Sequence, residues 1–146
     1  MDWLPALIAA VALPAAAVAI GLAWRSSTGR VRATSGDAAT NDLGLAADSL
    51  GTAATLVQFS TAYCSRCPST ARQLAAIAGD YDGVRHVEID LADRPDLADR
   101  FHVLQTPTTL ILDAGGAATA RLGGVPRAHD VRDRLDNLTG RSRVPS

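Results

Sequence analysis

The sequence predicts an α/β protein in which a mixed central sheet of about four strands, flanked by helices, follows one transmembrane helix. Two observations indicate this. Trp3–Trp24 is apolar and uncharged, and from about residue 52 short strand-like runs alternate with stretches of helical periodicity. We therefore expect an anchor at 1-24, a flexible linker at 25-51, the α/β domain at 52-140 and a tail at 141-146.

The first segment has the length and polarity of a membrane-spanning helix. As a helix, Trp3–Trp24 would span about 33 Å, the thickness of a bilayer's hydrocarbon core. A cleaved signal peptide is the alternative, but Asp2 is the only charged residue before the segment, so the positive region of a signal peptide is missing. We expect an uncleaved anchor that contacts membrane lipid through residues 3-24. Its alanines either have no specific role or form a surface that packs closely against a helix of another membrane protein.

The charges beside the anchor predict its orientation. Arg25, Arg30 and Arg32 follow the apolar segment, and no Lys or Arg precedes it. The positive-inside rule then places the amino terminus outside and the domain in the cytoplasm. An extracytoplasmic domain is the alternative.

The segment 25-51 is rich in Ser, Thr, Gly, Asp and Ala, which is typical of a flexible tether. Near its end, Leu43, Leu45 and Leu50 are candidates for a short turn that docks on the domain.

The domain opens with a strand and a helix. Thr55–Phe59 is β-branched and aromatic, which predicts a buried strand that ends near Ser60. Apolar residues then recur at helical spacing and predict a helix over about 65–79. The remaining elements follow from the same patterns: strands at Val84–Asp90, Thr108–Leu112 and Ala117–Leu122, a short helix at Arg94–Phe101, and a last helix marked by Val131, Leu135 and Leu138.

The two cysteines of the chain lie between the first strand and its helix, in Cys64-Ser65-Arg66-Cys67-Pro68. Only a thiolate attacks a disulfide, and a helix N-terminus stabilises an anion. Arg66 adds a positive charge between the sulfurs, so we assign Ser65 and Arg66 to tuning of the thiol pKa. Cys64, the earlier and more exposed residue, is the expected nucleophile, and Cys67 the resolving thiol.

A cysteine pair of this kind has two other uses. Structural zinc needs four ligands, but no second cysteine pair exists, and His86, His102 and His129 have no paired spacing. A purely structural disulfide would close a loop of two residues, which gains little entropy. Redox chemistry is the stronger interpretation.

From about Thr55 to Leu138, the sequence resembles the thioredoxin family, and within it the membrane-anchored thioredoxin-like proteins of bacteria. The resemblance lies in Tyr63–Cys67, Val87–Asp90, Thr106–Leu110, Gly115 and Gly123.

The resemblance implies a thioredoxin-like fold that needs no cofactor beyond a redox-active Cys64-Cys67 disulfide. The implied partners are protein disulfide substrates and an upstream thiol reductant. It also implies a cis Pro107 beside the cysteines, a Thr106 backbone that pairs with an extended substrate, and Tyr63 as an aromatic docking surface.

The chain departs from the family at two buried positions. Gln58 stands where thioredoxins carry a carboxylate that helps to deprotonate the resolving cysteine, and His86 stands where the family often has lysine. Water or His86 would then accept the proton, unless His86 is simply a strand residue. The family's first strand and helix are expected to be shortened into the linker.

These features predict a membrane-tethered thiol-disulfide oxidoreductase that reduces protein disulfides. The alternatives are a non-catalytic docking subunit of a membrane complex and a dithiol that binds metal. A net charge of -1 without a basic stripe gives no reason to expect nucleic acid as a partner.

Overall fold

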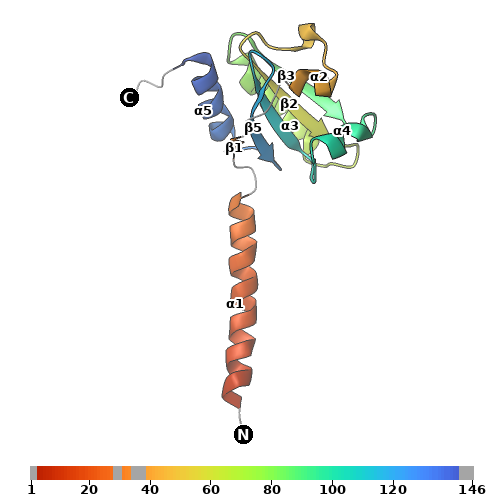
Figure 1. The fold of residues 1–146 in the computed structure, drawn as a ribbon. Helices are drawn as coiled ribbons and strands as arrows, with labels where there is room; N and C mark the ends of the chain where they lie inside the picture. Colours follow the sequence, from red (N-terminus) through yellow and green to blue (C-terminus); the bar gives the residue numbers. More distant parts are fainter. Residues whose placement is uncertain (1–2, 28–30, 34–38, 142–146) are drawn as a thin grey trace.

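A computed structural model describes residues 3–27, 31–33 and 39–141 of the 146-residue chain. Helix α1 (Trp3–Ser27) extends away from an α/β domain (Figure 1). All its described side chains are exposed, and within the described residues it is the one helix long and apolar enough to cross a membrane. By length and composition this helix is a candidate membrane span, and a signal sequence has the same properties.

The domain is built on one mixed sheet in the order β1-β5-β4-β2-β3. Strands β2 (Ala54–Ser60) and β3 (Val84–Asp90) are parallel, while β4 (Thr108–Asp113) pairs antiparallel with both β2 and β5 (Ala118–Gly123). These four strands confirm the predicted mixed sheet. A short strand, β1 (Val31–Ala33), adds a fifth at the edge, where it pairs with β5.

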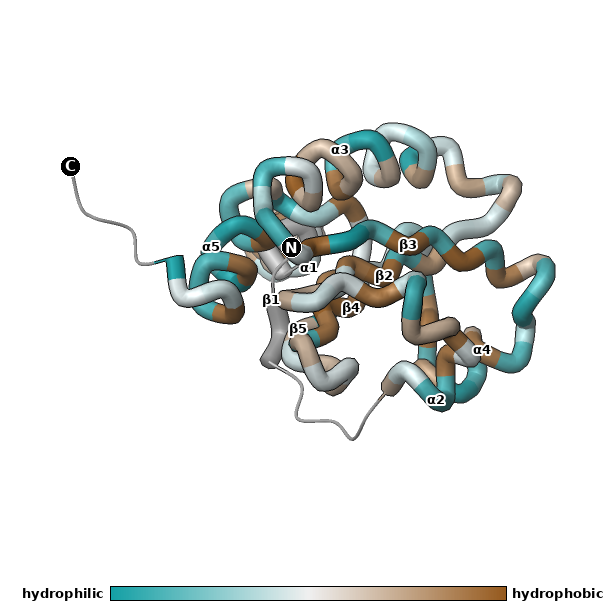
Figure 2. Tube along the Cα trace, turned by 90° about the horizontal axis from the view of Figure 1, so that it is seen from above, coloured by the Kyte–Doolittle hydropathy of each residue, from teal (hydrophilic) through white to brown (hydrophobic). Residues whose placement is uncertain are grey.

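Two hydrophobic clusters cover the two faces of the sheet. On one face, helices α3 (Cys67–Gly79) and α5 (Ala128–Thr139) pack against alternate residues of β2, such as Leu56. On the other face, α2 (Ala39–Leu43) and α4 (Pro95–Arg100) cover the intervening residues, such as Phe59. Figure 2 shows the sheet between α3 on one side and α2 and α4 on the other. Because both faces are covered, every residue of β2 is buried.

The structure differs from the flexible linker expected at 25-51. Within that range it contains β1, α2 and the single 3-10 turn η1 (Ala47–Ser49). Leu43 is 1% exposed, and Leu45 and Leu50 pack against the same cluster. These three leucines, the candidates for a docking turn, attach the end of the predicted linker to the domain.

Helix α2 is fixed by a contact with the hairpin between β4 and β5. The Ala39 N–H donates to the Gly116 carbonyl at 2.9 Å. Gly116 has a φ of +81°, and a Cβ there would lie 2.6 Å from the Thr40 Cγ2. Glycine is therefore required at this position by both its backbone conformation and the closeness of α2.

Candidate active site

The two cysteines form a disulfide directly after the end of β2. Their Cα atoms are 5.4 Å apart, and the S–S distance is 2.12 Å. Cys67 is 2% exposed, whereas Cys64 is half-buried. A molecule approaching from solvent therefore reaches Cys64 before Cys67.

Helix α3 begins at Cys67, two residues later than the expected start near Ser65. The Cys67 N–H donates to the Cys64 carbonyl at 3.2 Å, so the residues between the cysteines form a turn rather than helix. Pro68 lies in the first helical turn, where its missing N–H costs nothing. Both sulfurs thus lie at the helix N-terminus, whose unpaired N–H groups favour a thiolate. Ser65 and Arg66 lie in the turn and are exposed.

The loop before β4 lies beside this turn. The Thr106-Pro107 peptide bond is cis, as the family resemblance implied. Thr61 links the two segments: its carbonyl accepts from the Cys64 N–H at 3.1 Å, and its Oγ1 is 3.4 Å from the Oγ1 of Thr106. The exposed end of the disulfide and the cis-proline loop therefore form one continuous surface.

A chain of two hydrogen bonds runs from Cys67 into the interior. Gln58 is fully buried, and its Nε2 donates to the Cys67 carbonyl at 3.1 Å. Its Oε1 lies 3.1 Å from the Nε2 of His86. An amide oxygen can only accept, so this His86 nitrogen carries the proton and Nδ1 is the free base when the ring is neutral. Burial lowers the pKa of His86, and the nearby Glu88 opposes that shift.

Two buried hydroxyls lie on the elements around this chain. Thr109 pairs with Gln58 in the sheet, and Thr70 lies one helical turn after Cys67. Both residues are 0% exposed, and their Oγ1 atoms have no hydrogen-bond partner among the described residues. The interior beneath the disulfide is therefore more polar than a core of aliphatic side chains. Sequence reasoning missed these threonines because threonine is also an ordinary strand residue.

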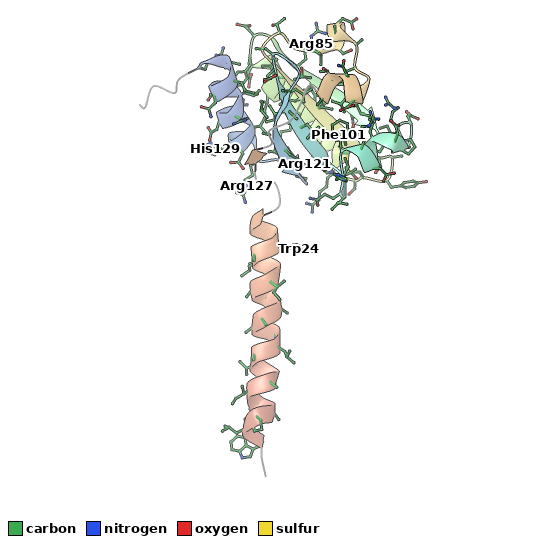
Figure 3. The ribbon with its side chains drawn as sticks, in the orientation of Figure 1. Trp24, Arg85, Phe101, Arg121, Arg127 and His129 are labelled. Carbon is green, nitrogen blue, oxygen red and sulfur yellow. A yellow bond between two sulfur atoms is a disulfide. The ribbon has the colours of Figure 1, made fainter. Side chains whose placement is uncertain are left out.

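Arg121 on β5 holds the segment that leads to the cis proline. Its Nη1 donates to the Phe101 carbonyl and its Nη2 to the His102 carbonyl, the latter at 2.7 Å. Figure 3 shows Arg121 beside Phe101 at one end of the sheet. Burial lowers the pKa of Arg121. Its signal in the sequence is a charged residue inside an alternating strand, a pattern that does not by itself indicate a partner.

Two large apolar side chains are fully exposed on the described part of the domain. Tyr63, next to Cys64, is 99% exposed, and Leu104, three residues before Pro107, is 94% exposed. Tyr63 had been predicted as a docking residue, while Leu104 was missed. Tyr63 precedes Cys64, and Leu104 lies in the loop that leads to the cis proline, so both add apolar surface at the end of the sheet that carries the disulfide.

The described residues contain no group of three or more His, Cys, Asp or Glu side chains that could hold a metal ion. The Cys64–Cys67 disulfide is a redox-active group that the described structure presents.

Comparison with known proteins gives a consistent result. The thioredoxin family model matches residues 47–137. A thioredoxin from Staphylococcus saprophyticus is 30% identical over 81 residues, which cover 55% of this chain and 78% of the relative. A thioredoxin from Staphylococcus haemolyticus is 32% identical over 73 residues, or 49% of this chain and 70% of the relative.

Solved structures show the same fold. A mutant thioredoxin from Halobacterium salinarum has a TM-score of 0.53 at 18% identity, and covers 64% of this chain and 80% of its own. A thioredoxin from Nicotiana alata has a TM-score of 0.52 at 24% identity, with coverage of 60% and 74%.

Proposed function

The chain belongs to the thioredoxin family and is a thiol-disulfide oxidoreductase, and we propose that it acts as a membrane-tethered reductase of protein disulfides. One observation carries the proposal: half-buried Cys64 forms a disulfide with buried Cys67 at the start of a helix, beside a cis proline. In this arrangement the sulfur of Cys64 is accessible to an external disulfide, and the sulfur of Cys67 is placed to attack the mixed disulfide that forms.

The reaction consists of two exchanges. In the reduced protein, the Cys64 thiolate attacks one sulfur of the substrate disulfide, whose S–S bond breaks, and the other substrate sulfur leaves as a thiolate that takes up a proton. The Cys67 sulfur, once deprotonated, attacks Cys64 and re-forms the internal disulfide. The substrate leaves with two thiols, and two electrons have passed to it from the pair. An upstream thiol reductant restores the dithiol.

The surrounding residues have supporting roles in this proposal. The helix N-terminus, Ser65 and Arg66 favour the thiolate of Cys64. The backbone of Thr106 pairs with an extended substrate segment, and Tyr63 contacts it. Gln58 positions the Cys67 carbonyl, and His86 is the titratable group next to Gln58, with water as the alternative acceptor of the Cys67 proton.

Helix α1 supplies the tether in this proposal. Its flanking arginines support a cytoplasmic domain, where a reducing thiol pool is available. Tethering raises the effective concentration of the domain for partners in the same membrane.

The test uses the full chain with either cysteine replaced. Cys64→Ser should reduce insulin disulfides no faster than the uncatalysed background, because the attacking sulfur is gone. Cys67→Ser should accumulate a mixed disulfide with the substrate, visible on a non-reducing gel, because nothing resolves it. Arg72→Gln, an exposed change on the same helix, is the matched control and should keep the rate.

Full turnover by Cys64→Ser would contradict the proposal. Retention of cellular function by both cysteine variants would favour the alternative, a docking subunit without catalysis.

A further inference from the structure

One row of paired residues connects the edge of the sheet with the redox site. Val31 of β1 pairs with Leu122, Leu122 with Thr109, and Thr109 with Gln58. The side chain of Gln58 donates to the Cys67 carbonyl. The chain therefore enters the sheet at the level of the disulfide, three strand spacings or about 14 Å to the side.

Strand β1 begins, on the side of the chain that leads back to α1, at the end of the sheet where the disulfide lies. Strand β1 is antiparallel to β5, β5 to β4, and β4 to β2, so β1 and β2 run in opposite directions. The start of β1, at Val31, consequently lies at the end of the sheet where β2 ends and the cysteines follow. Figure 1 shows β1 beside β5 at the edge of the sheet.

The connection to the anchor is short. Helix α1 ends at Ser27 and β1 starts at Val31, so four Cα–Cα steps separate them, with a reach of at most about 14 Å. Trp24, the last residue of the apolar segment, is one helical turn earlier. With Trp24 at the membrane interface, Val31 stays within roughly 20 Å of the bilayer surface. The disulfide, about 14 Å to the side of Val31, then lies at most about 34 Å from that surface.

The exposed surface at that end suits a partner at the interface. Tyr63 and Leu104 present apolar groups there, with exposed Arg66 between the cysteines. Tyrosine is favoured at interfaces where its ring contacts apolar groups and its hydroxyl contacts water. A site turned away from the membrane would instead require a tether long enough to pass around the domain.

We propose that α1 and β1 together hold the Cys64–Cys67 pair near the membrane, so that its substrates are disulfides close to the bilayer surface in proteins embedded in the same membrane. This inference rests on the proposed function and specifies its substrate class. The exchange is the two-step reaction described above, in which the reduced pair gives two electrons to the substrate disulfide and becomes oxidised.

The test reconstitutes the full chain in phosphatidylcholine vesicles with two designed single-span peptides. Each peptide carries the same cyclic disulfide, either about 10 Å beyond the bilayer or about 40 Å beyond it on a helical Glu-Ala-Lys spacer. The protein is reduced with dithiothreitol, which is then removed, and the single-turnover appearance of peptide thiols is followed. We expect the near disulfide to be reduced at least about tenfold faster than the distant one.

Two variants test whether β1 and the short connection set this preference. An insertion of about twenty Gly and Ser residues between Ser27 and Val31 should bring the ratio of rates below about twofold, since its coil reaches the distant probe. Replacing residues 31–33 by Gly-Ser-Gly should lower the ratio as well, because it weakens the pairing with β5 that attaches this segment to the active-site end of the sheet. The same insertion after Arg141 is the matched control and should leave the ratio unchanged.

The outcomes separate this inference from the proposed function. If the unaltered chain reduces both probes equally in vesicles, or if the insertion at 28–30 leaves the preference intact, the inference is wrong while the oxidoreductase remains. If the chain reduces neither probe in detergent, where distance from a membrane plays no part, the proposed reductase is wrong and the inference falls with it.

Discussion

At the scale of single residues, Gln58 distinguishes this site from that of the typical family member. A buried carboxylate at this position would carry a charge that must be neutralised, whereas the amide satisfies the Cys67 carbonyl and His86 at the same time. Gln58, unlike a carboxylate, cannot accept the Cys67 proton. His86, which is half-buried, is the titratable group at the end of the chain of hydrogen bonds.

The lowered pKa of His86 predicts a pH dependence of stability. Burial disfavours the imidazolium, so below about pH 6.5 the unfolded chain binds a proton that the folded protein resists. This contribution is therefore intact above that pH and is lost as the pH falls. Between pH 7.5 and pH 5, the free energy of unfolding of the wild type should fall more than that of His86→Gln, as measured by urea denaturation at both pH values. Equal losses in the two proteins would contradict this assignment.

The sequence predicted the cysteine pair and the cis-proline loop, but not the buried threonines around them or how the buried polar residues are connected. Cys64 and Cys67 themselves form a strong local motif, and the cis Pro107 followed from the family resemblance. The bond between Gln58 and His86 joins residues 28 positions apart and depends on the register of two strands. No local pattern in the sequence specifies that register.

At the scale of elements, the docked helix α2 is the main addition to the predicted fold. A helix of 5 residues has no independent stability, so it exists because Ala39 and Leu43 are buried against the sheet. The polar residues around them have the composition of a linker. Periodicity cannot identify such an element, since one helical turn contains too few positions to show a period.

The burial of α2 predicts a large effect of one substitution. Leu43→Ala should lower the free energy of unfolding by about 2–5 kcal/mol, because it leaves a cavity in the cluster that contains Phe59 and Leu112. Leu104→Ala removes the same atoms from a 94% exposed site and should change stability by less than about 0.5 kcal/mol. Urea denaturation of the oxidised proteins measures both. Equal stability of the two variants would mean that residues 39–43 do not belong to the folded domain.

At the scale of the whole molecule, strand β1 determines which end of the α/β domain is joined to the predicted anchor. A freely tethered domain would present its active site in any direction. Pairing of Val31–Ala33 with β5 attaches the chain to the active-site end of the sheet four residues after the end of α1. Three residues at a sheet edge are too short to be predicted from composition, and their pairing depends on the exposed edge of β5.

The most direct test of the reductase is a redox titration of the full chain in detergent. The protein is equilibrated with glutathione or dithiothreitol buffers, and the free thiols are counted by alkylation and mass spectrometry. We predict that Cys64 and Cys67 become alkylated together in a single two-electron transition with a midpoint near or below about −250 mV. A midpoint above about −150 mV, or a disulfide that does not equilibrate with the buffers, would contradict a reductase.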